Sequence, residues 1–221
     1  YKPWTGDYQG LPPFDKIETE DFKPAIEAAM KKALAEYDKL ANDPTLPTFE
    51  NTMVPMEKIS SDLGRVMILF SIWNSNISND EIQKVEKEMA PKLAEFSDKI
   101  TQNSKLFERI DSLYKNKTAK LTKEQKRLIW DYHQGFVKGG AALNPEQKKR
   151  VAEINKRHAE LTTAFSQNML ADENEDHLHI ENEKDMAGLP DWLIKSAKEE
   201  AEKRGKKGFV ISNTRSSMQP F

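Results

Sequence analysis

The chain has 221 residues, of which 37% are hydrophobic and 32% are charged. It is long enough to bury a sizeable core, and this balance suits a well-solvated helical protein rather than a membrane protein. A net charge of −2 gives no overall field that attracts nucleic acid, and the absence of cysteine excludes disulfides and thiolate metal sites.

The first predicted elements are an irregular arm and an amphipathic helix. Residues 1–18 contain three prolines and two glycines, a composition typical of irregular structure. From Phe22 to Leu40 apolar residues recur at steps of three and four, which predicts one helix with a single buried face. Pro44 and Pro47 lie beyond its end.

A second helix is predicted from about Thr48, a candidate N-cap, to Trp73. Pro55 lies inside it, so a late start or a kink is expected near Asn51. The segment 66–73 is apolar on all sides, and we expect it to be among the most buried parts of the chain.

Four more helices are predicted before residue 175. Ser78 and Glu81 form a capping-box pattern for the first, whose apolar stripe reaches Ile100 and includes Pro91, where a bend is expected. The second is a short helix at 106–114, and the third begins with Thr122 and Gln125 and ends at Gly139 and Gly140. The fourth and longest begins with Asn144 as N-cap and Pro145 at its first position. Its apolar stripe contains Val151, Ile154, His158, Leu161, Phe165 and Met169.

The pattern changes near Asp176. The segments 177–180 and 208–212 read as short strands, and a helix from Pro190 to Arg204 lies between them. The predicted organisation is mainly α: an N-terminal arm at 1–18, a helical lobe of six or seven helices at 19–175, and a strand-helix-strand segment at 176–221. Because the chain stops soon after a strand, we expect it to be part of a longer protein.

The four histidines are the first candidates for metal chemistry. A helical zinc hydrolase needs two histidines one turn apart with a glutamate between them, and no pair here has that spacing. His177 and His179 would face one side of a strand, either as metal ligands with Asp176 or Glu181 or as a solvated polar face. His158 lies in an apolar stripe and is expected to be a hydrogen-bonded core residue, whereas His133 has no evident carboxylate to orient it.

Other chemistries also lack a signal. Ser60, Ser61, Ser216 and Ser217 have no nucleophile-elbow context, and no glycine-rich phosphate loop is present. The basic stretch 115–127 has no interleaved aromatics, so no nucleic-acid partner is expected, and no apolar run is long enough for a membrane span. We therefore predict no catalytic, cofactor-binding or metal-binding residue in this chain.

Six segments in a fixed order carry information beyond their periodicity. They are LPPFDKIETEDFKPAIEAAM at 11–30, PTFENTMVPMEK at 47–58, and the stretches 74–110, 121–143, 161–174 and 187–212. In these segments, and in their order, the chain resembles the opening part of zinc metallopeptidases of the thimet oligopeptidase and peptidyl-dipeptidase family, and within it the bacterial peptidyl-dipeptidases (dipeptidyl carboxypeptidases). Pro55 departs from the family pattern, which usually has a helix former there.

The resemblance implies a large two-lobed helical enzyme with a deep substrate channel. It implies one zinc, held by an HExxH helix and a downstream glutamate that would lie beyond Phe221, and an oligopeptide substrate from which C-terminal dipeptides are released. This chain would form one wall of the channel and contact its own C-terminal catalytic half.

Two further expectations complete the prediction. The resemblance implies a location in the bacterial cytoplasm or periplasm, and the first residue, Tyr1, favours an exported protein whose signal has been removed. The alternative function, which periodicity alone leaves open, is a free-standing helical adaptor that binds a protein partner through an exposed apolar face.

Overall fold

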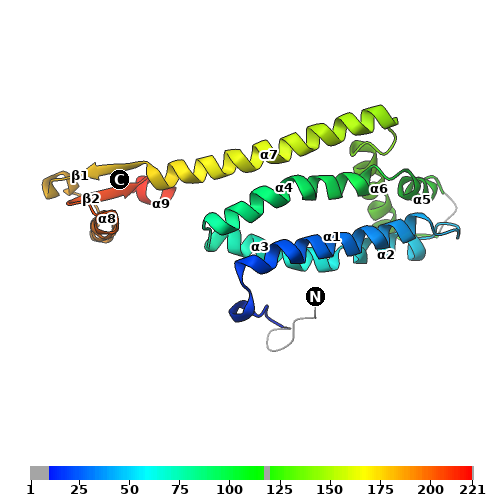
Figure 1. The fold of residues 1–221 in the computed structure, drawn as a ribbon, viewed down its shortest axis with the longest axis horizontal. Helices are drawn as coiled ribbons and strands as arrows, with labels where there is room; N and C mark the ends of the chain where they lie inside the picture. Colours follow the sequence, from blue (N-terminus) through cyan, green and yellow to red (C-terminus); the bar gives the residue numbers. More distant parts are fainter. Residues whose placement is uncertain (1–9, 117–119, 221) are drawn as a thin grey trace. The chain divides into compact units, whose positions relative to one another are not determined.

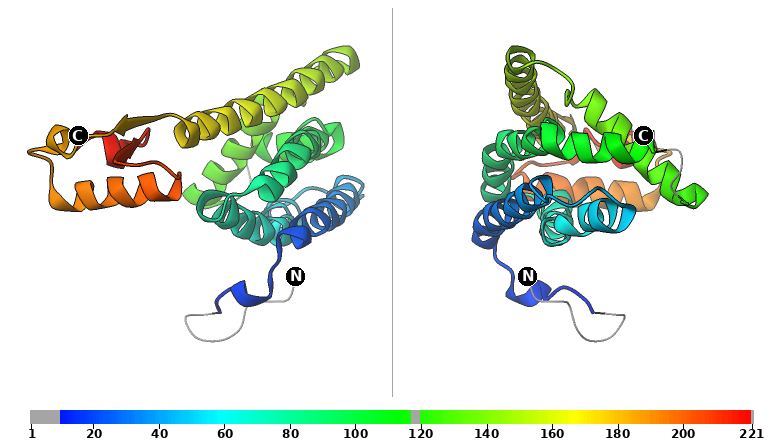
Figure 2. Two further views of the ribbon diagram at one scale, coloured as in Figure 1. Left: turned by 60° about the vertical axis from the view of Figure 1, so that its left-hand side comes forward. Right: turned by 90° about the vertical axis from the view of Figure 1, so that its right-hand side faces the viewer.

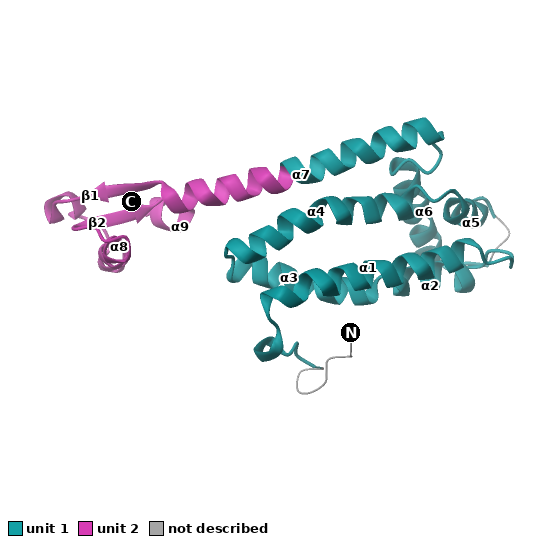
Figure 3. Ribbon diagram, viewed as in Figure 1, with its two compact units in different colours: residues 1–161 teal, residues 162–221 magenta. Residues whose placement is uncertain are grey.

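The computed structural model describes residues 10–116 and 120–220. Two compact units, Tyr1–Leu161 and Thr162–Phe221, divide the chain inside one long helix (Figure 3). Most of the described residues are helical, and a small two-stranded sheet lies near the C-terminus (Figure 1), so the predicted mainly α fold class is confirmed. Part of the predicted arm, residues 1–9, lies outside the described residues. No helix in the described ranges is long and apolar enough to cross a membrane.

Unit 1 is built around α1 (Thr19–Ala41), which begins with a reciprocal capping box of Glu18 and Asp21. Near its start, Phe22 packs edge-on against the rings of Phe70 and Trp73 at centroid distances of 5.5 Å. Phe14, from the arm, stacks on the same tryptophan. The helices that contact α1 in unit 1 (Figure 2) are α2 (Val54–Ile59), α3 (Ser61–Asn76), α4 (Asp80–Thr101) and α5 (Ser104–Lys115).

The second predicted helix is divided into three pieces. Thr48 caps a π-helical turn, η3 (Phe49–Met53), which is followed by α2 and, after a break at Ser60, by α3. Pro55 lies at the start of α2, where a missing N–H is tolerated, so the irregularity predicted near Asn51 is confirmed. The break at Ser60 was not predicted.

The segment 66–73 is not uniformly buried, and that prediction was wrong in part. Leu69, Phe70 and Trp73 are buried, but the side chain of Ile68 is 56% exposed. Only one face of α3 packs on the rest of unit 1, because α3 lies at the surface of a small lobe and its neighbours cannot cover all of its sides.

The next three helices, α4, α5 and α6, lie close to where the sequence predicted them, and one N-cap differs. The N-cap of α4 is Asn79, whose side chain accepts from the amide of Ile82, so the capping box predicted at Ser78 and Glu81 was placed one residue early. α4 continues through Pro91 without interruption. α5 matches the predicted short helix, and α6 (Lys123–Lys138) begins with the predicted capping box of Thr122 and Gln125.

The longest of the described helices is α7 (Pro145–Glu175). The side chain of Asn144 accepts from the amide of Gln147, and the amide of Asn144 donates to the side-chain oxygen of Gln147, as its N-cap pattern predicted. No residue of α7 is buried, and Ile154, Leu161, Phe165 and Met169 of its predicted apolar stripe are between 49% and 70% exposed. In unit 1, polar side chains connect it to α4 and α5 instead: Asn155 donates to Asp98, and Lys148 donates to the carbonyl of Gln102 and to Ser104.

Unit 2 contains both predicted strands. β1 (His177–Ile180) pairs antiparallel with β2 (Phe209–Ser212), so that Ile180 lies opposite Phe209. A Cβ at Gly208 would lie 2.3 Å from the carbonyl oxygen of Ile180, so only glycine fits there. The small core lies between the sheet and α8 (Asp191–Lys203), the predicted helix between the strands. Two short helices complete the unit, η4 (Glu183–Met186) and α9 (Arg215–Met218).

Candidate functional site

His177 and His179 both lie on β1, separated by Leu178, but nitrogen atoms of both rings contact other groups. Nδ1 of His177 lies 2.6 Å from the carbonyl oxygen of Glu175, and its Nε2 contacts the ammonium of Lys206. Nε2 of His179 lies 2.6 Å from the carbonyl oxygen of Lys207. A cation beside an imidazole lone pair opposes metal binding, so the solvated polar face is the better description of this pair.

His133 is oriented by a carboxylate, contrary to the sequence-based expectation. Its Nε2 lies 3.1 Å from Oδ1 of Asp111, one helix away on α5. The imidazole also stacks on Tyr114 at a centroid distance of 4.1 Å and lies 5.4 Å from the ring of Phe107. Two helices separated in sequence supply this arrangement, so no local pattern could have predicted it.

His158 was expected in the core, and that expectation was wrong. It lies on α7 and is exposed to solvent, like the apolar residues of the same stripe. Across residues 10–116 and 120–220, no group of three or more histidine, aspartate or glutamate side chains is arranged to hold a metal ion. The described residues therefore do not fit a zinc site.

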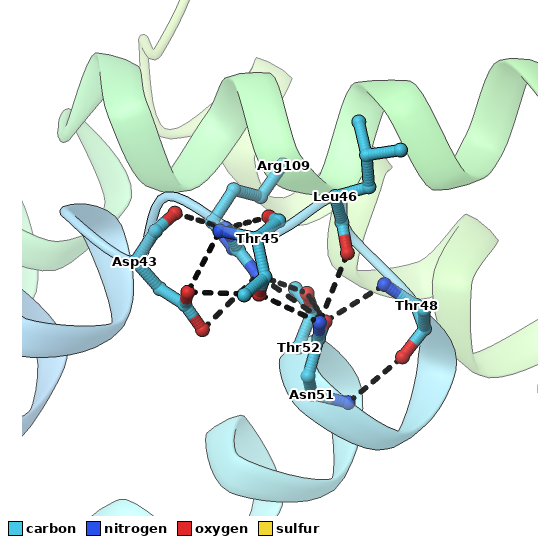
Figure 4. A network of polar contacts seen from close by, with 7 residues as sticks. All are labelled: Asp43, Thr45, Leu46, Thr48, Asn51, Thr52 and Arg109. Carbon is cyan, nitrogen blue, oxygen red and sulfur yellow. Dashed lines mark hydrogen bonds and ion pairs between the residues drawn. The ribbon is translucent and has the colours of Figure 1, made fainter.

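The most developed polar cluster surrounds Arg109 of α5, which is 6% exposed (Figure 4). Its Nη1 donates to the carbonyl oxygens of Asp43 and Thr45 at 2.7 and 3.0 Å. Its Nη2 donates to Asn51 and Thr52 at 3.2 Å each. The fixed fork of a guanidinium can satisfy several acceptors at once, so one side chain ties the loop after α1 to η3 and to α5.

The loop itself is closed by a second set of hydrogen bonds. Asn51 accepts from the amide of Thr48 and donates to the carbonyl oxygen of Leu46 and to the hydroxyl of Thr45. The amide and hydroxyl of Thr45 both donate to Asp43, and together with Arg109 they hold the pKa of the Asp43 carboxyl below its usual range. These hydrogen bonds connect most of the loop, which leaves the Leu46 side chain 86% exposed.

An open cavity of about 760 Å³ adjoins this loop. Apolar side chains form much of its lining, among them Leu40, Pro44, Pro55 and Ile59. The sequence indicated the turn at Pro44 and Pro47 and the N-cap at Thr48, but it gave no sign that Arg109 hydrogen-bonds to this loop. A buried arginine 57 residues after its acceptor Thr52 has no local signature.

The chemistry available in this cluster is structural. A guanidinium engaged by carbonyl oxygens is neither a nucleophile nor a general base, and its remaining Nε has no hydrogen-bond partner among the described residues. The Arg109 cluster fixes the shape of a surface. Neither this cluster nor the Asp111–His133 pair has the metal ligands, or the nucleophile and base, that a hydrolytic centre needs.

The Asp111–His133 pair gives one prediction about pH. Contact with Lys115, and then with His133, holds the pKa of the Asp111 carboxyl below its usual range. The unfolded chain lacks these contacts, so the stability that Asp111 contributes is complete above the unfolded-state pKa and is lost as the pH falls through the folded-state pKa. The Asp111→Asn variant should therefore be less stable than the parent at neutral pH, and the difference should shrink below about pH 4.

Urea denaturation at pH 7 and pH 3 would measure this difference. The exposed Asp131→Asn, on the neighbouring helix α6 and paired with Arg127 at the surface, is a matched control for which little change is expected at either pH. A difference for Asp111→Asn that is the same at both pH values would show that the carboxylate pairing does not stabilise the fold.

Comparisons with known proteins show long matches to peptidases. The chain is 31% identical to the dipeptidyl carboxypeptidase of Escherichia coli over 195 residues, 88% of this chain and 29% of that protein. It is 30% identical to the dipeptidyl carboxypeptidase of Salmonella typhimurium over 95% of this chain and 31% of that protein. It is 31% identical to the oligopeptidase A of Haemophilus influenzae over 91% of this chain and 30% of that protein. No family model matches the chain.

Proposed function

Because this chain belongs to the thimet oligopeptidase and peptidyl-dipeptidase family, we propose that it is the non-catalytic N-terminal lobe of a longer zinc-dependent oligopeptidase. The observation that carries the proposal is the coverage of the matches. The relatives match 88% to 95% of this chain, whereas the chain spans only 29% to 31% of their length.

The surroundings of the histidine side chains support the assignment of this lobe as non-catalytic. Each histidine that the sequence offered as a metal ligand is exposed, paired with a carboxylate, or engaged by a carbonyl or an ammonium group. We therefore assign the zinc ligands and the catalytic residues of the parent enzyme to the polypeptide beyond Phe221.

The role that we propose for this lobe is to form one wall of the substrate channel. A wall must hold its shape, and unit 1 has two buried apolar clusters that include residues of α1, together with the loop fixed by Arg109. A peptide held in register along a rigid surface reacts faster, because its position is already restricted before the reaction. The lobe would therefore affect which peptides are cleaved without touching the bond that breaks.

The names of two relatives support a specific reaction, the release of dipeptides from the C-terminus of an oligopeptide. The test is to incubate the full-length protein with a peptide blocked at its N-terminus and to identify the products by mass. Release of C-terminal dipeptides, abolished by a chelator and restored by zinc, is the expected result. Cleavage at internal bonds only would favour an oligopeptidase A type of activity instead.

The alternative, a free-standing adaptor, is favoured by one observation, the exposed apolar stripe of α7. The coding sequence beyond Phe221 distinguishes the two functions. An open reading frame that continues through an HExxH motif supports the peptidase lobe, whereas a stop codon directly after Phe221 supports the adaptor.

A further inference from the structure

The open cavity of about 760 Å³ beside the loop after α1 has the size and lining of a small-ligand site. Three neighbouring parts of unit 1 form it: the last turns of α1, the loop at 42–44, and the segment of η3 and α2. Leu40, Pro44, Pro55 and Ile59 give it an apolar wall. Pockets that bind small ligands have about 300–1,000 Å³ and combine such a wall with a few polar groups that orient the ligand.

Charged side chains of both signs also line this cavity, namely Glu36 and Lys39 from α1 and Asp43 from the loop. Within residues 10–116 and 120–220, Lys39 has no ion-pair partner. Each carboxylate has one ion-pair contact near the distance limit: Glu36 lies 3.9 Å from Lys32, and Asp43 lies 3.8 Å from Arg109. A carboxylate accepts up to about four hydrogen bonds, so both keep room for a donor from a ligand.

The spacing of these charges matches the two ends of a dipeptide. Glu36 and Lys39 are three residues apart on α1, so their Cβ atoms lie about 5–6 Å apart on one side of the helix. The amine and the carboxylate of an extended dipeptide are separated by two residue lengths, about 7 Å. A longer peptide, or one with a blocked end, cannot offer both charges at this spacing, and an uncharged apolar ligand would leave them without partners.

We propose that this cavity binds a dipeptide with apolar side chains and two free ends. Its carboxylate binds Lys39, its amine binds Glu36, and a side chain packs against Pro55 and Ile59. The choice of ligand rests on the proposed function, because dipeptides are the product that we propose for the parent enzyme. The bound dipeptide would also contact the loop after α1, which Arg109 connects to α5 (Figure 4).

Amide hydrogen exchange in the full-length protein tests the proposal. The probe is leucyl-leucine, added at increasing concentration to protein whose zinc has been removed by a chelator. Exchange at residues 42–46 should slow several-fold and reach a plateau, because a ligand that binds the folded loop makes its opening less frequent. The concentration for half of this effect should rise about tenfold in Lys39→Gln and in Glu36→Gln, each of which removes one charge-assisted hydrogen bond.

The matched control is Lys31→Gln, which changes an exposed lysine of α1 that does not line the cavity and should leave the response unchanged. Acetyl-leucyl-leucine and leucyl-leucine amide, which each lack one charge, should protect the loop several-fold more weakly than leucyl-leucine.

Three results would overturn the proposal: no protection at residues 42–46 up to the solubility limit of leucyl-leucine, the same half-effect concentration in the parent and in Lys39→Gln, or equal protection by the blocked peptides. The exchange measurement does not depend on cleavage. A failure of the proposed function would instead appear as the absence of dipeptide release by the zinc-loaded protein, whatever the exchange pattern.

Discussion

Replacing Ile154 with proline in the full-length protein is expected to lower peptide turnover strongly while the zinc content stays unchanged. Proline at this interior position of α7 removes the N–H that bonds to the carbonyl of Arg150 and clashes with that carbonyl, at a cost of about 3 kcal/mol or more. The neighbouring Asn155 connects α7 to the buried Asp98 of α4, so the break falls where the helix is held to unit 1.

The size of the effect follows from positioning. A misplacement of about 1 Å in a surface that orients substrate can cost on the order of 10²-fold in rate. Peptide turnover and zinc content are measured together, with Ile154→Leu as the control that keeps the helix and the apolar character of the site. Normal turnover in a proline variant whose lobe is shown to be unfolded would rule out the channel-wall role.

Replacing Arg109 with methionine is expected to destabilise unit 1 by about 3 kcal/mol, because each buried acceptor left without a donor costs about 1–3 kcal/mol. Methionine keeps the apolar stem of the arginine but leaves the carbonyl oxygens of Asp43 and Thr45 unpaired. Arg109→Lys should recover part of the loss, since one ammonium group cannot reach all four acceptors in the geometry of the guanidinium.

Denaturant titration measures the stability, and amide hydrogen exchange locates the change. Exchange should accelerate first at Asn51 and Thr52, which the guanidinium contacts. Lys105→Met is the matched control, because Lys105 precedes Arg109 by one turn of α5 and contacts the same loop from an exposed position. An equal loss of stability in both variants would show that the burial of Arg109 has no special role.

The sequence predicted the elements of the fold well because their signals are local. Both strands, the capping box at Thr122 and the start of α7 at Pro145 depend on residues within one turn or one strand of each other. The errors arise where the tertiary environment decides. Ile68 and His158 lie in apolar stretches, and periodicity cannot show whether an apolar face meets a partner.

The polar clusters could not be predicted for a related reason. Arg109 and its acceptors, like His133 and Asp111, come from separate elements, and only the packing of α5 on its neighbours brings them together. What the sequence did provide was the family, because an ordered series of moderately specific segments extends over nearly the whole chain.

The measurement that tests the central claim most directly compares the chain of 221 residues with the full-length protein. Both are incubated with zinc and a blocked oligopeptide, and metal content after gel filtration and peptide cleavage are determined for each. We expect the full-length protein to retain zinc and to cleave the peptide, and the 221-residue chain to do neither, because its described residues contain no group arranged to hold a metal ion. Chelator-sensitive cleavage by the purified 221-residue chain would contradict the assignment of a non-catalytic lobe.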